Sequence, residues 1–220
     1  MNAQSTRWRV VLDTQWAWTR GVLLLGSIVA FALPLVALDM AVGAKSEVAF
    51  IGTMQAWSIG YALTAGGMGL LIAIATWSYD HRLRHVYALT LPIARWRYVL
   101  QRYTAGLALL ALPTIALLAG AEIASHSSAV PTTLHAYPVA LTLRFAFATL
   151  VAYSIFFGIS SATARTAGYV LGAIALVIVA QTVLSAAGSS VSVIGRVSDI
   201  VFATPGVLAV FSGRWTLIDV

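Results

Sequence analysis

The sequence has no cysteine, a single lysine at Lys45, and few charged residues of either sign. Without cysteine, the chain can form neither a disulfide nor a thiolate metal site. Only 9% of the 220 residues are charged, against roughly 25% in soluble domains, and 60% are hydrophobic. The formal charge of +6 comes mainly from arginines that stand beside apolar runs, which favours a role in membrane topology over nucleic-acid binding. These features predict an integral membrane protein.

Five apolar runs have lengths near the roughly 17–25 residues that cross a bilayer. We therefore expect one transmembrane domain over residues 1–220, an all-α polytopic helix bundle with spans at 21–38, 57–78, 99–123, 138–162 and 166–187. Pro113 is expected to bend the third span, which neighbouring membrane helices can tolerate. Small residues let membrane helices approach closely, and they predict packing faces at Gly66, Gly67, Gly168 and Gly172.

The segment before the first span, residues 8–20, is amphipathic at helical spacing. Arg9, Asp13 and Arg20 lie on one side of it. The other side carries Trp8, Leu12, Trp16 and Trp18. This pattern predicts an elbow helix that lies flat at the membrane interface with its tryptophans at headgroup depth. The alternative is an ordinary amphipathic start to the first span.

Residues 188–220 contain only one apolar stretch, Ile200 to Phe211, and it is interrupted by Thr204, Pro205 and Gly206. An apolar run of about 10–14 residues is too short to span a bilayer and favours an outer re-entrant or interfacial segment.

The longest basic and patterned interruption of the apolar sequence covers residues 77–103. It contains one acid, Asp80, against five arginines, Arg82, Arg84, Arg95, Arg97 and Arg102. Short loops rich in cations are retained on the cytoplasmic side of a membrane. Within the loop, residues 85–91 can form about two turns of helix that end before Pro92. A short, partly apolar helix on the inner face suits a groove on a soluble partner.

The distribution of all cationic residues predicts the orientation of the chain. With the five spans above, nine arginines fall on one side of the membrane, and Lys45, Arg144, Arg196 and Arg214 fall on the other. We therefore expect a cytoplasmic N-terminus.

The chain offers little for catalysis or for nucleotide binding. Its acids lie almost all at predicted span edges, so a membrane-embedded enzyme lacks the paired groups it needs at depth. The glycines around Met68 lack the lysine and hydroxyl residue of a phosphate loop, so any ATP must be bound by another subunit. His81 and His85 have the i, i+4 spacing of a helical metal pair, but solvated loop histidines are far more common. We assign no catalytic, cofactor or metal site.

Residues 89–95, Leu-Thr-Leu-Pro-Ile-Ala-Arg, precede the third span and resemble a Leu-x-x-x-Pro-x-x-Arg-like pattern. Together with the span layout, this resembles the membrane subunit of an ATP-binding cassette exporter of the type-2 permease family. The resemblance implies an elbow at residues 8–20, a coupling helix at about 80–97, a tight basic turn at 160–167 and a dipping segment from Val201 to Trp215. The family's acidic-Gly-Thr element is reduced to Asp80, and its sixth span is absent. Either the chain is a five-span variant or the natural chain continues past Val220, and we expect the second.

The resemblance further implies a permease subunit in the inner (cytoplasmic) membrane that moves a substrate with ATP hydrolysed elsewhere. Its partners would be cytosolic ATP-binding cassette ATPases and a second permease subunit, in a homo- or heterodimer. The implied docking residues are Arg82, Arg84, His85, Val86, Leu89, Leu91, Pro92, Arg95 and Arg97. An accessory or structural subunit of a larger membrane complex remains an alternative, because such a protein needs only packing faces.

Overall fold

The computed structural model describes residues 3–82, 94–161 and 215–219, together with separate positions between 169 and 212. The chain divides into two compact units. The first contains residues 1–157 and 214–220, and the second contains residues 158–213.

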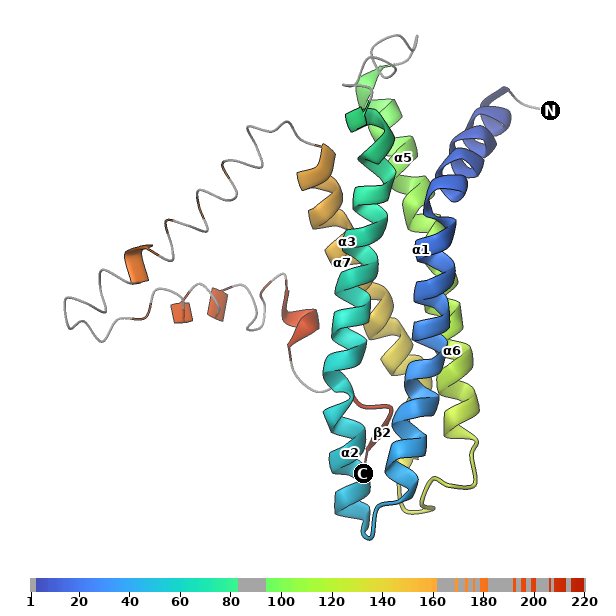
Figure 1. The fold of residues 1–220 in the computed structure, drawn as a ribbon, viewed down its shortest axis with the longest axis vertical. Helices are drawn as coiled ribbons and strands as arrows, with labels where there is room; N and C mark the ends of the chain where they lie inside the picture. Colours follow the sequence, from blue (N-terminus) through green and yellow to red (C-terminus); the bar gives the residue numbers. More distant parts are fainter. Residues whose placement is uncertain are drawn as a thin grey trace. The chain divides into compact units, whose positions relative to one another are not determined.

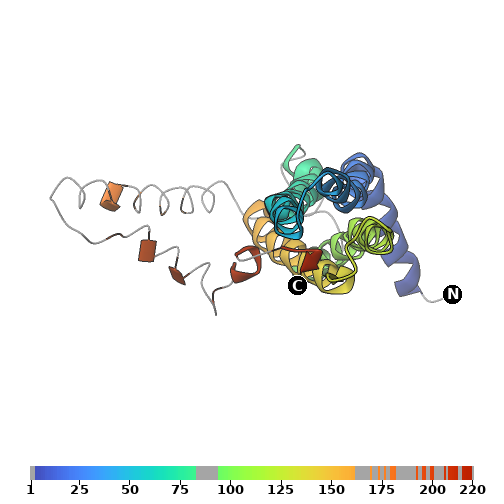
Figure 2. The ribbon, with the colours of Figure 1, turned by 90° about the horizontal axis from the view of Figure 1, so that it is seen from below.

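The first unit is an antiparallel helix bundle (Figure 1). Its helices are α1 (Ala3–Val42), α2 (Glu47–Ala56), α3 (Ser58–Arg82), α5 (Arg95–Leu109), α6 (Ala111–Ser125) and α7 (Pro138–Ser161), the last turn of which belongs to the second unit. The helix α1 packs against α3, α5 and α6, and Figure 2 shows the bundle end-on.

Four stretches of the described helices are long and apolar enough to cross a membrane. They are Trp8–Val42, Glu47–Ser78, Trp96–Ser125 and Pro138–Ser161. The prediction of an all-α helix bundle is thus confirmed, and the four candidate crossings favour a multi-pass membrane protein. Each stretch contains most of one of the first four predicted spans. Of the predicted fifth span at 166–187, the described positions Tyr169, Ala173, Leu176 and Val179 to Gln181 are helical.

The first helix does not separate into an elbow and a span. α1 is continuous from Ala3 to Val42, because residues 8–20 contain no glycine or proline that would end it. Its first turns lean away from the rest of the bundle (Figure 1). The amphipathic segment is therefore the start of a long helix in this structure.

Two other helix boundaries differ from the predicted spans. The second crossing begins ten residues early, at Glu47 of α2, because the Ser46 side chain caps that helix and accepts from the Ala49 amide at 3.2 Å. The third crossing is interrupted at Leu110, between α5 and α6. Pro113 lacks the N–H that would bond to the Leu109 carbonyl, so this proline accounts for the interruption about one turn before it.

A small antiparallel sheet accompanies the helices. β1 (His135–Ala136) pairs with β2 (Ile218–Asp219), and His135 lies opposite Asp219. The Tyr137 amide extends the pairing by donating to the Leu217 carbonyl at 2.7 Å. Residues 218–219 form a strand because the loop before α7 supplies a pairing edge.

At two glycines of the described helices, the backbone of a neighbouring helix comes very close. A Cβ on Gly69 of α3 would collide with Ala152 and Tyr153 of α7, and a Cβ on Gly120 of α6 would collide with the Phe31 backbone of α1. The predicted packing residue Gly67 has open space around it within this chain. Gly168 and Gly172 lie outside the described residues.

Candidate functional site

Arg102, two turns into α5, is the charged residue that the described bundle buries most deeply, with 6% of its surface exposed. Its guanidinium carbon lies 5.2 Å from the ring centre of Trp18 on α1 and 5.6 Å from that of Trp77 on α3. Tyr98, one turn earlier on α5, is 4.9 Å away. A desolvated cation over an aromatic ring gains about 2 kcal/mol. Arg102 therefore joins three helices through one side chain.

Arg102 also makes a hydrogen bond to the backbone of α3. Its Nη1 donates to the carbonyl oxygen of Thr76. Thr76 is fully buried, and its hydroxyl oxygen lies 2.7 Å from the Ile72 carbonyl oxygen. Hydrogen bonds from charged donors are stronger than neutral ones, and they weigh more where water is excluded. The start of α5 is thus fixed to the end of α3.

Gln15 links α1 to the same place. It is 2% exposed, and its side-chain amide lies 2.7 Å from the Thr76 hydroxyl. With the amide oriented so that donors meet acceptors, its nitrogen donates to the Arg102 carbonyl at 3.2 Å and its oxygen accepts from the Gly106 amide at 3.3 Å. A side chain at Gly106 would occupy the position of this amide and of the Tyr153 hydroxyl. The glycine is what lets α1 and α7 reach the α5 backbone.

α7 completes the arrangement through aromatic and hydroxyl groups. The hydroxyls of Tyr103 and Ser154 are 2.8 Å apart, and the Tyr153 hydroxyl donates to the Tyr103 carbonyl at 3.4 Å. The rings of Tyr103 and Tyr153 stack with centres 5.4 Å apart. We call this buried polar set the Arg102 junction; its members are Gln15, Thr76, Arg102, Tyr103, Gly106 and Tyr153.

The polar groups of the Arg102 junction attach helices to one another. The junction contains amide, hydroxyl and guanidinium groups but no carboxylate or imidazole that could serve as a general base. Among the residues that the structure describes, no three His, Asp or Glu side chains gather as a metal site. What the junction does is hold four helices together at one end of the bundle.

The predicted docking residues border this end. Arg82 is the last residue of α3 and Arg95 is the first of α5, so both flanks of the predicted coupling segment adjoin the Arg102 junction. Arg97 is exposed, and its guanidinium lies 5.2 Å from the ring centre of Trp96. The remaining predicted docking residues lie outside the described part of the chain: Arg84, His85, Val86, Leu89, Leu91 and Pro92.

The predicted elbow residues have unequal surroundings. Trp8 and Trp16 are exposed, as an interfacial tryptophan would be, and Leu12 is half-buried. Trp18 is half-buried against Arg102. Its contact with a guanidinium on another helix was not foreseen from the sequence.

The sequence did contain a signal for the burial of Arg102, although the charge pattern alone assigns this residue to membrane topology. Three buried residues of α5 are spaced around Arg102 at helical intervals. Tyr98 lies four residues before it, Ala105 three residues after it and Leu109 seven residues after it. This is the spacing of one helix face. Extending the face through the arginine would have placed Arg102 inside the bundle.

The opposite end of the first unit carries smaller polar contacts. The guanidinium of Arg144 on α7 lies 4.9 Å from the ring centre of Trp215, beside an open pocket of about 210 Å³. The Thr133 hydroxyl donates to the Glu47 carboxylate at 2.7 Å. These contacts attach loops and β2 to the bundle.

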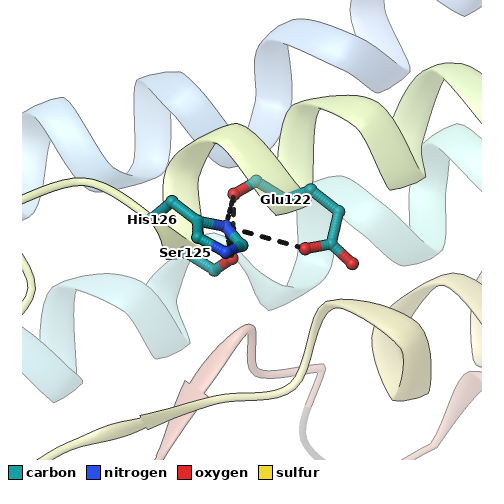
Figure 3. A network of polar contacts seen from close by, with 3 residues as sticks. All are labelled: Glu122, Ser125 and His126. Carbon is teal, nitrogen blue, oxygen red and sulfur yellow. Dashed lines mark hydrogen bonds and ion pairs between the residues drawn. The ribbon is translucent and has the colours of Figure 1, made fainter.

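At this same end, His126 closes the last turn of α6 (Figure 3). Its Nδ1 is 2.8 Å from the Glu122 carbonyl oxygen, 3.2 Å from the Ser125 hydroxyl and 3.8 Å from the Glu122 carboxylate. An imidazole that satisfies a terminal carbonyl caps the helix. The exposed side chain has this capping role in the structure and does not form part of a buried site.

Comparisons of this chain with protein-family models, with curated proteins and with solved structures gave no match. The case for a function therefore depends on the chain's own residues.

Proposed function

We propose that this chain is the membrane subunit of an ATP-driven exporter, a permease of the type-2 ATP-binding cassette kind. A cytosolic ATPase binds the connection between α3 and α5, and ATP-driven closure of that partner moves the inner ends of the helices. The substrate crosses between two such membrane subunits.

The observation that carries this proposal is the position of the Arg102 junction near the residues where α3 ends and α5 begins. Arg102 is only seven residues beyond Arg95, where α5 begins, and its guanidinium binds the α3 backbone at Thr76. A force on residues 83–94 therefore reaches α3 and α5 together, and it reaches α1 through Gln15 and Trp18. A loop that only sets topology would need no such bracing.

The charge around the connection supports the cytoplasmic side and a soluble partner. Arg82, Arg95 and Arg97 flank it, at the same end as the first turns of α1 (Figure 1). Cations beside membrane spans favour the inner face. Because the sequence has no phosphate loop, the nucleotide is bound by the partner.

Co-purification tests the proposal. The chain, tagged and isolated from native membranes, should bring with it a stoichiometric protein that has Walker A and Walker B motifs. Leu89→Asp and Leu91→Asp place a charge on the apolar face that we assign to docking, and each should abolish recovery of the ATPase while membrane insertion persists. A charged side chain in an apolar groove is costly unless it is paired.

Val48→Asp is the matched control. Val48 is 80% exposed and lies in the first turn of α2, at the opposite end of the bundle from the proposed docking segment. An acid there is favoured by the helix dipole, so recovery of the ATPase should be unchanged. Recovery of an intact complex without an ATPase would refute the proposal and favour the accessory-subunit alternative. Undiminished ATPase binding by both leucine variants would refute the docking role.

A further inference from the structure

We infer that residues 8–20 of α1, which we call the latch, can detach from the bundle, and that contacts with Arg102 hold them in place. Residues 8–20 would occupy two positions, one in which Gln15 and Trp18 contact α3 and α5, as in this structure, and one at the membrane interface. The inference concerns this chain alone and does not require an ATPase partner.

The two halves of α1 are held by different kinds of contact. In residues 8–20 the buried side chains are Gln15 and Thr19, both polar. From Leu23 to Ala41 the buried side chains are apolar. Apolar burial holds a helix wherever surfaces fit, whereas a polar attachment depends on particular partners. The attachment of the first half is therefore the more specific and the easier to release.

Those particular partners converge on Arg102. Its guanidinium lies under the Trp18 ring, and its carbonyl accepts from the Gln15 amide when that amide is oriented to match its neighbours. Thr76, the other partner of Gln15, is itself bonded to the Arg102 guanidinium through its carbonyl. Removing the arginine side chain takes away the contact with Trp18 and loosens the position of Thr76.

The sequence of α1 fits both positions. Gly21 follows the latch directly, has open space around it, and weakens the helix at that point relative to other residues. The exposed residues of the latch include Trp8, Arg9 and Trp16, which are side chains that headgroup regions accommodate. The amphipathic pattern that predicts an interfacial helix thus describes the released position, and the structure shows the bound one.

Spin-label distances test the latch, and the cysteine-free sequence makes labelling specific. One pair, Ala17→Cys with Leu100→Cys, joins exposed positions on the latch and on α5. A second pair, Val36→Cys with Ile115→Cys, joins exposed positions on the outer half of α1 and on α6 and serves as the control. Both pairs are measured in the full chain in lipid nanodiscs, with Arg102 present and with Arg102→Gln.

Arg102→Gln should broaden the first distance distribution and shift it to longer distances, and leave the control distribution unchanged. Arg102→Lys should have an intermediate effect, because an ammonium keeps the cation over the rings but lacks the planar fork of donors. An unchanged first distribution in Arg102→Gln overturns the inference.

If Arg102→Gln broadens both distance distributions, the variant has lost its fold. The same two distances are then measured in Gln15→Leu, and that result decides whether the latch exists. This change keeps a similar volume and removes the amide contact with Thr76. Broadening of the first distribution alone supports the latch. No change in either distribution, or broadening of both, overturns it.

Discussion

Two arginines five residues apart on α5 have opposite surroundings. Arg97 is exposed and lies over the neighbouring Trp96, whereas Arg102 is buried among aromatic rings from two helices and its own. A buried cation is costly unless its donors are satisfied, so the contacts of Arg102 are a condition of its burial. We therefore expect Arg97→Gln to change the free energy of unfolding by less than about 0.5 kcal/mol and Arg102→Gln to lower it by about 2–3 kcal/mol. Equal thermal stability of the two purified variants would contradict this.

Glycine provides a second comparison at the scale of single residues. Gly67→Ala should raise the free energy of unfolding by about 0.5–1 kcal/mol, because alanine is the better helix former and the position is open. Gly106→Ala should lower it by about 1–3 kcal/mol, because the methyl group would displace the Gln15 amide and the Tyr153 hydroxyl. Thermal unfolding of both variants in the same detergent measures the difference. A Gly106→Ala variant as stable as Gly67→Ala would mean that the close approach at the Arg102 junction is not required.

At the scale of whole elements, the sequence predicted what depends on local patterns. Apolar runs indicated the helices, and Pro113 indicated the break in the third crossing, because both effects act within a few residues. β2 was not predictable, since its partner β1 is about 80 residues away in the chain and two-residue strands have no periodicity. The small residues of α3 predicted a packing face but did not single out Gly69 over Gly67, because only the position of α7 decides which of the two is covered.

β2 also gives a prediction at the element scale. Trp215 is 1% exposed, and Arg144 of α7 lies over its ring. Trp215→Ala should lower the free energy of unfolding by about 3 kcal/mol, because it leaves a cavity and removes the cation–π contact. Trp96→Ala, at an exposed tryptophan on α5, is the control and should have a small effect. Thermal unfolding of the two variants decides, and equal losses would show that β2 is not part of the stable bundle.

At the scale of the whole molecule, the first unit has two distinct ends. Residues 94–97 at the start of α5 lie at one end, and the loop before α7 lies at the other, where β2 pairs with it. The spans between these ends are long enough to cross a membrane. The loop before α7 and residues 215–219 must therefore share one side of the bilayer, whatever path the chain takes between Ser161 and Trp215.

Single cysteines in the otherwise cysteine-free chain test this arrangement. Thr132→Cys in the loop and Thr216→Cys beside β2 should both react with a membrane-impermeant maleimide in intact cells. Ala94→Cys should react only after the membrane is permeabilised, because the arginines around it favour the cytoplasmic side. Reaction of Thr132→Cys and Thr216→Cys on different sides would contradict the bundle itself. If Ala94→Cys reacts in intact cells and the other two cysteines are protected, the bundle is correct but its orientation in the membrane is inverted. The proposed docking segment would then face away from the cytosol, and the proposed function would be refuted.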